Sequence, residues 1–179
     1  ERATARLKLV VPAMLLIIYV MLYLTFRRTD EALLVMATLP FSVIGGVWLL
    51  WWLDHNVSVA SAVGFIGLAG VVAEFGIVML VYLKQAWDER IARGEVSEAA
   101  LVDAIRDGAA LRVRPKAMTV ATIGSGLVPT LWDTGTGSEI TQRTAAPMIG
   151  GMITAPLLSM LVIPACFLLL RRAGLRRAG

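Results

Sequence analysis

The sequence predicts an all-α protein, a polytopic bundle of five transmembrane helices. Hydrophobic residues make up 58% of the 179 residues, and the mean hydropathy is +0.75, more than one soluble core of this size needs. Long apolar stretches recur along the chain, and a helix needs about 20 apolar residues to cross the hydrocarbon core of a bilayer. Basic residues collect in alternate connections between the stretches, as they do in membrane proteins.

Five apolar stretches are interpreted as membrane-spanning helices. Three of them contain no charged residue, namely 9–26, 32–53 and 144–170. The third stretch along the chain carries a single acid, Glu74, and the fourth is short. We therefore predict one transmembrane domain, residues 1–179, with spans at about residues 7–27, 32–53, 57–83, 113–132 and 144–170.

The connection between the third and fourth spans, residues 84–112, is long and charged. Within it Ser97 is suited to cap the N-terminus of a helix, and Gly108 is suited to end one. We expect a short amphipathic helix there, at the cytoplasmic surface. The charge-free run that follows, 117–132, is too short to cross a bilayer alone, so the fourth span has to include Lys116.

The basic residues also predict an orientation. With the N-terminus outside, the inner segments contain 13 of the 17 Lys and Arg residues, including the cluster Arg171, Arg172, Arg176 and Arg177. Cytoplasmic loops collect such residues, so the C-terminus is predicted to be cytoplasmic. The pI of 9.7 then reflects topology, and no nucleic-acid partner is expected. Because the chain opens abruptly at Glu1 and is all membrane, we expect it to be a piece of a larger protein.

Glu74 is the candidate functional residue. An ionisable group at membrane depth costs about 2.5 kcal/mol or more, and such residues usually line a pathway for ions or protons. Gly64, Gly67 and Gly70 recur at every third position before it, which predicts close packing of a central helix. Glu74 borders this row, so we expect it to face protein, and Lys116 is its candidate partner from the fourth span.

A pair of this kind predicts a proton relay. Burial favours a protonated carboxyl group, whereas a nearby ammonium group favours the ionised form, so Glu74 would change protonation with conformation. The alternative is a static ion pair that only locks two helices together. Thr119 and Thr122 would hydrogen-bond near the pair, or else to the backbone of their own helix.

Other chemistry finds little support in the sequence. Cys166 and His55 have no His or Cys at ligand spacing, and the methionines are interpreted as packing residues, so no metal-binding residue is assigned. The sequence has neither a phosphate-binding loop nor a hydrolase motif. We expect a transporter rather than an enzyme, with no bound cofactor.

Four separated blocks of the sequence carry a family resemblance, namely Val72 to Gly76, Leu111 to Thr119, Gly135 to Glu139 and Ala146 to Met152. They resemble the heavy-metal efflux branch of the resistance-nodulation-division transporters, in detail the copper- and silver-exporting members. In the family these members can carry a methionine between the third block and the last span, where this sequence has Ile140, Thr141, Gln142 and Arg143.

The resemblance implies the final five spans of a twelve-span, proton-driven antiporter that exports Cu(I) or Ag(I) across the bacterial inner membrane. The N-terminus would be periplasmic and the C-terminus cytoplasmic. Glu74 and Lys116 match the family's relay, whose third member is an aspartate from the other half. The resemblance also implies a homotrimer that works with a periplasmic adaptor and an outer-membrane channel. Three alternatives stay open: export of divalent zinc, cobalt or nickel, a purely structural membrane module, and a passive channel.

Overall fold

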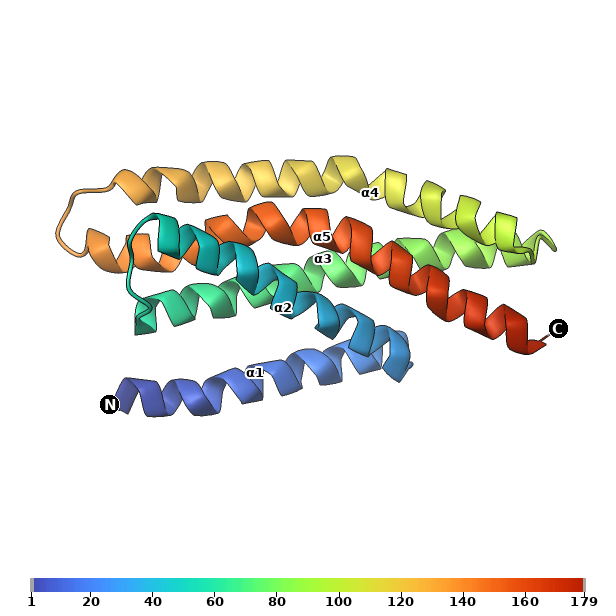
Figure 1. Ribbon diagram of the computed structural model, residues 1–179, viewed down its shortest axis with the longest axis horizontal. Helices are drawn as coiled ribbons and strands as arrows, with labels where there is room; N and C mark the ends of the chain where they lie inside the picture. Colours follow the sequence, from blue (N-terminus) through green and yellow to red (C-terminus); the bar gives the residue numbers. More distant parts are fainter. Residues whose placement is uncertain (1, 179) are drawn as a thin grey trace.

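The structure, a computed structural model, is a bundle of long helices (Figure 1). It describes residues 2–178, with side chains up to residue 175, so Arg176 and Arg177 of the basic cluster lie outside the described side chains. Within these residues there are helices and no strands, which confirms the all-α class. The helices are α1 (Arg2–Phe26), α2 (Thr29–Trp52), α3 (Val59–Ala92), α4 (Glu98–Leu127), the short 3₁₀ helix η1 (Val128–Trp132) and α5 (Ser138–Ala178).

Four of the described helices, α1, α2, α3 and α5, are each long and apolar enough to cross a membrane. The fourth in order, α4, does not meet that criterion because its N-terminal half carries the charges of the 84–112 connection, so a span at 113–132 stays a prediction. Helix α3 has 34 residues and is about 51 Å long at 1.5 Å per residue, against a hydrocarbon core of about 30 Å. It therefore extends well beyond the bilayer at one end.

The helix expected in the 84–112 connection begins where it was predicted to begin, but the predicted position of its C-terminal end is wrong. Ser97 caps it as predicted, because its Oγ accepts a hydrogen bond of 3.1 Å from the N–H of Ala100. Yet the helix does not stop at Gly108 and continues as α4 to the end of the predicted fourth span. Gly108 is buried against α3, where a Cβ would lie 3.1 Å from the carbonyl oxygen of Tyr82, so this glycine permits close helix contact.

The connections alternate between the two ends of the bundle (Figure 1). The N-terminus and the turns at 53–58 and 133–137 lie at one end, and the turns at 27–28 and 93–97 lie at the other with the C-terminus. This is the alternation that the basic residues predicted. Which end faces the cytoplasm stays a prediction from the charges.

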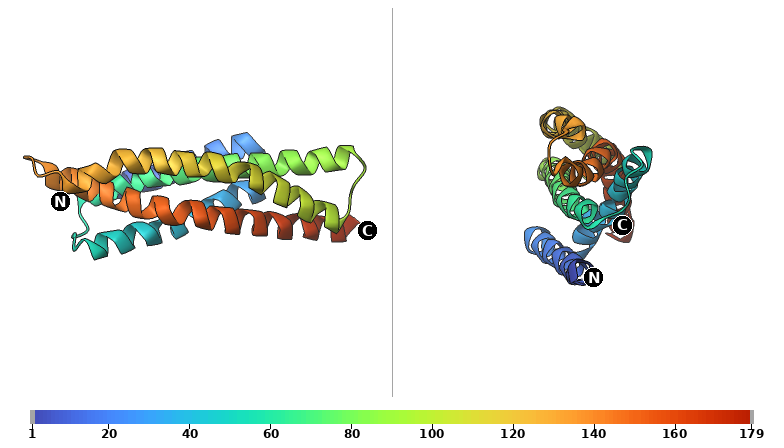
Figure 2. Two further views of the ribbon diagram at one scale, coloured as in Figure 1. Left: turned by 90° about the horizontal axis from the view of Figure 1, so that it is seen from above. Right: turned by 90° about the vertical axis from the view of Figure 1, so that its left-hand side faces the viewer.

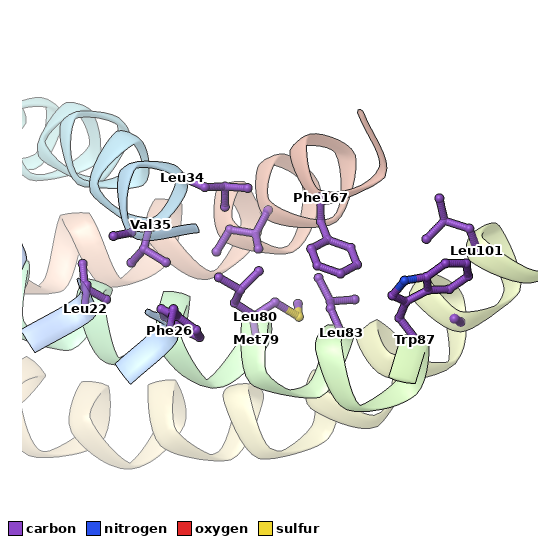
Figure 3. Close-up of a cluster of buried hydrophobic side chains, with 13 residues drawn as sticks. Leu22, Phe26, Leu34, Val35, Met79, Leu80, Leu83, Trp87, Leu101 and Phe167 are labelled. Carbon is purple, nitrogen blue, oxygen red and sulfur yellow. The ribbon is translucent and has the colours of Figure 1, made fainter. Parts of the chain in front are cut away.

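A buried apolar cluster fixes the end of the bundle near the 27–28 turn (Figure 3). All five α-helices contribute to it, and most of its side chains are less than 2% exposed. Burial of a large apolar side chain contributes about 1.5–3 kcal/mol, so this is the best-packed part of the chain. The members labelled in Figure 3 are Leu22 and Phe26 from α1, Leu34 and Val35 from α2, Met79, Leu80, Leu83 and Trp87 from α3, Leu101 from α4 and Phe167 from α5.

Helix α5 lies among α2, α3 and α4, whereas α1 lies to one side (Figure 2). Glycines allow α2 and α5 to cross closely: the Cβ of an alanine at Gly150 would overlap the carbonyl oxygen of Gly45. At Gly46 the added atom would lie 2.9 Å from the carbonyl oxygen of Pro147. Small residues at helix crossings are the usual packing device in membranes, so α5 is positioned by backbone contact with α2.

Candidate functional site

Lys116 is the most deeply buried charged side chain of the predicted site. It lies on α4 and is 2% exposed. Its Nζ donates a hydrogen bond of 2.6 Å to the Oγ of Ser159 on α5, which is itself 1% exposed. Ser159 in turn donates to the carbonyl oxygen of Pro156 at 3.0 Å. A lysine therefore joins the fourth and fifth helices inside the bundle.

The same lysine reaches the level of Glu74. Its Nζ lies 5.7 Å from the ring centroid of Phe75, the residue next to Glu74 on α3. The sequence estimate of depth, which brought the two residues within the reach of a lysine side chain, agrees with this contact. The guanidinium of Arg112, one turn earlier on α4, is the charged group that acts on Lys116 electrostatically.

Glu74 itself is exposed on the surface of the chain. Among the described residues, no ion pair or hydrogen bond joins it to Lys116, whose partner in this arrangement is Ser159. The two residues therefore lie at the same level without being paired. Their role as a proton relay stays a prediction.

The glycine row explains why Glu74 is exposed. Residues at every third position turn back by about 60° per step, because each residue of an α-helix turns by 100°. Gly64 is buried against α5, where a Cβ would lie 2.6 Å from Cγ of Pro147, but around Gly70 there is no atom within 4 Å. Gly67, Gly70 and Glu74 share a face of α3 that is open within this chain, so the expectation that Glu74 faces protein stays a prediction.

Helix α3 nevertheless contacts each of the other four α-helices, which agrees with the predicted central position. Its buried side carries that packing. Gly76, for instance, faces Val35 of α2, and a Cβ there would lie 2.6 Å from Cγ1 of that valine. The open face of α3 is thus a narrow strip with a carboxyl group at its centre.

Thr119 and Thr122 hydrogen-bond to the backbone of their own helix, which was the second of the two roles considered for them. Thr119 donates to the carbonyl oxygen of Pro115 at 3.1 Å, and Thr122 donates to that of Met118 at 2.9 Å. Both acceptors lie one turn back on α4. Neither hydroxyl contacts Lys116, so in this arrangement the threonines are bonded to their own helix.

The sequence reasoning missed a second buried charged group. Glu31, at the start of α2, is 3% exposed and accepts hydrogen bonds from Lys84 of α3 at 2.9 Å and from Arg171 of α5 at 3.2 Å. Lys84 also lies 5.6 Å from the ring of Phe26. The carboxylate thus ties three helices together near the apolar cluster. Because it follows a polar turn in the sequence, nothing in the local pattern distinguishes it from a solvated acid.

Ser159 was also missed. It is one of few hydroxyl side chains in the charge-free stretch 144–170, and that isolation is the signal which could have drawn attention to it. Cys166 is half-buried on the same helix. Within the described residues, no three His, Cys, Asp or Glu side chains gather as a metal site would require.

Comparisons with known proteins agree with one another. Residues 1–171 match the AcrB/AcrD/AcrF family. The chain is 57% identical to the cation efflux system protein CusA of Escherichia coli K12 over 95% of its length, and 56% identical to the putative cation efflux system protein SilA of Salmonella typhimurium. It is 37% identical to the cobalt-zinc-cadmium resistance protein CzcA of Cupriavidus metallidurans.

The fold agrees as well. A crystal structure of a heavy metal efflux pump superposes on 96% of this chain with a TM-score of 0.80 at 31% sequence identity. The chain covers 16% of that pump, and it spans about a sixth of the length of the curated relatives. The likeness therefore concerns one membrane segment of much longer proteins.

Proposed function

Because the chain belongs to the AcrB/AcrD/AcrF family, we propose that it carries the proton-relay helices of a pump that exports Cu(I) or Ag(I) by proton antiport. Membership of this transporter family and four apolar helices make it part of an integral protein of the bacterial inner membrane. The observation that carries the relay is the position of Lys116, buried beside the residue next to Glu74.

In the proposed cycle, Glu74 takes up a proton while Lys116 is held elsewhere, and it loses the proton when the ammonium group approaches. A unit charge that crosses the membrane potential contributes about 2.3 kcal/mol per 100 mV, so a few protons suffice to drive a conformational change. The open face of α3 around Glu74 supports this role. In the intact pump we place there the helices of the other half, with the third relay member.

The proposed cargo rests on the sequence blocks that resemble copper- and silver-exporting members. A lower identity to CzcA than to CusA and SilA supports this over export of divalent cations, which is the second candidate. The metal-binding cleft itself would lie mostly in periplasmic domains. We further propose a homotrimer with a periplasmic adaptor and an outer-membrane channel, and a periplasmic N-terminus for this segment.

The replacement Glu74→Gln in the intact pump tests the relay. Proton release coupled to metal transport is expected to stop in proteoliposomes, and cells are expected to lose copper and silver resistance. The matched control is Glu89→Gln, which makes the same change at an exposed position of the same helix and should leave transport intact. Normal transport by Glu74→Gln at normal expression would refute the relay.

The rival classes make different predictions. A passive channel would keep conducting metal after the proton gradient is collapsed. A structural module would tolerate the joint replacement of Glu74 and Lys116 by apolar residues. A pump for divalent cations would protect cells against zinc, cobalt or nickel and not against copper or silver.

A further inference from the structure

The last span contributes the partner of Lys116 in this structure. Ser159 of α5 is the one hydrogen-bond acceptor that the described part of the chain provides for Nζ of Lys116. We propose that Ser159 is a positioning residue of the relay: it holds the Lys116 side chain on α5 while Glu74 is protonated, and it releases the lysine to Glu74 when that carboxyl group is ionised. The inference rests on the proposed function and adds a helix and a residue to it.

The orientation of the serine hydroxyl suits this role. A hydroxyl group has one hydrogen to donate and two lone pairs to accept. The hydrogen of Ser159 goes to the carbonyl oxygen of Pro156, 3.0 Å away on the same helix. Its lone pairs are thereby left for the N–H groups of Lys116. The backbone of α5 thus sets the hydroxyl as an acceptor before the lysine arrives.

The hydrogen bond between Lys116 and Ser159 is weak enough to be broken reversibly. An ammonium group has three hydrogens to donate, and Ser159 accepts one of them while the ring of Phe75 lies 5.7 Å away. The like charge of Arg112 opposes a positive charge at this position. Burying a charge costs less when a counter-charge pairs with it, so an ionised Glu74 is a stronger partner than a neutral hydroxyl. A protonated Glu74 offers no such advantage.

The geometry permits the exchange. Since Nζ already lies against Phe75, the next residue of α3, the lysine has to turn by about one residue position around that helix, or about 100°. Among the described residues, Arg112 of its own helix is the charged group that acts on Lys116 in this arrangement, and Glu74 lies on the neighbouring, open side of α3. From α5, Lys116 meets the hydroxyl of Ser159. The balance between the carboxylate and the hydroxyl decides when Glu74 can take up a proton.

The replacement Ser159→Ala removes the resting acceptor. Lys116 then spends more time beside Glu74. Because the ammonium group favours the ionised form of the Glu74 carboxyl group, a lower pH is needed to protonate that carboxyl group. In the intact pump we expect the pH profile of metal transport to move to lower pH by about 1 to 2 units, the shift that loss of one hydrogen bond to a charged group produces. The infrared band of the protonated Glu74 carboxyl group, identified by its loss in Glu74→Gln, should move by the same amount.

Two matched variants separate positioning from packing. Ser159→Thr keeps the hydroxyl and should keep the wild-type profile. Ser42→Ala removes a hydroxyl of equal burial, 1% exposed, which donates to the carbonyl oxygen of Leu39 at 2.6 Å without contacting a lysine. Ser42→Ala should leave the pH profile of transport unchanged, although it also removes a buried hydroxyl group from a helix of the bundle.

Gel filtration of each variant first establishes that the protein is folded, and only folded variants are compared. An unchanged profile and infrared titration in Ser159→Ala would overturn the positioning role, as would an equal shift in Ser42→Ala. If Glu74→Gln abolishes transport while Ser159→Ala behaves as wild type, only this inference fails. If Glu74→Gln transports normally, the relay itself fails and the inference with it.

Discussion

Oε2 of Glu31 lies 2.9 Å from Nζ of Lys84, and only 4% of the Glu31 side chain is exposed. Oε1 of the same carboxylate accepts from Arg171 at 3.2 Å. A single carboxylate thus bridges two cations from two other helices at the end of the bundle where the turn at 27–28 lies. Such a group stabilises the fold only as long as all its members are present.

We expect Glu31→Gln to lower the stability of the intact protein by about 1–3 kcal/mol. Breaking a fully buried pair costs about 3–5 kcal/mol, and the value is reduced here because the side chains of Lys84 and Arg171 are 27% and 23% exposed and water screens them. Thermal unfolding in detergent measures the change. Asp30→Asn, at the exposed neighbouring position, is the control, and equal effects of the two variants would contradict the role given to Glu31.

The crossing of α2 and α5 gives a second prediction. Gly150→Ala should destabilise the protein by about 1–3 kcal/mol, because its Cβ would overlap the backbone oxygen of Gly45 and force the helices apart. Gly174→Ala, at an α5 position with no atom within 4 Å, should be neutral or stabilising by up to about 1 kcal/mol, since alanine favours helix. A similar unfolding midpoint for both variants would show that the crossing tolerates a wider separation.

The sequence predicted the helices well because length, hydropathy and charge are properties of consecutive residues. Ser97 could be identified as a cap for the same reason, since a cap acts within one turn. Gly108 shows the limit of this reasoning. A glycine that ends a helix and one that admits a neighbouring helix look alike in sequence, and only the contact with Tyr82 of α3 distinguishes them.

Pairings between distant residues were beyond prediction. Glu31 is separated from Lys84 by 53 positions and from Arg171 by 140, and no periodicity links them. Helix geometry predicted that the Lys116 side chain bridges most of the difference in depth to Glu74, but its partner depends on the rotation of α5, which brings Ser159 to face it. Depth can be read along one helix, whereas rotation is set by packing between helices.

Orientation in the membrane gives a third prediction. In an intact pump whose native cysteines, Cys166 among them, are replaced by serine, a single cysteine at exposed Val96 should react with a membrane-impermeant maleimide only after the inner membrane is opened. A cysteine at Thr136, in the loop at the other end of the bundle, should react in cells whose outer membrane alone is permeabilised. The reverse pattern would mean that the basic residues do not determine orientation here.

Lys116 and Lys84 together provide the sharpest test, because the relay and the static ion pair predict opposite results for Lys116. Lys116 has no carboxylate partner among the described residues, and Ser159 keeps its bond to Pro156 when the lysine is lost. A buried charge without a counter-charge carries a desolvation cost that an apolar residue of similar size does not. Lys116→Met should therefore unfold no earlier than wild type and yet abolish proton-coupled transport.

Lys84→Met is the counterpart, because this lysine does have a carboxylate partner, Glu31. It should lower stability by about 1–2 kcal/mol and leave transport largely intact in the folded fraction. The comparison is made by unfolding in detergent and by transport in proteoliposomes for both variants of the intact pump. If Lys116→Met is the destabilised variant and still transports, its lysine only locks helices together. Stability retained with transport lost is the combination that a proton relay requires.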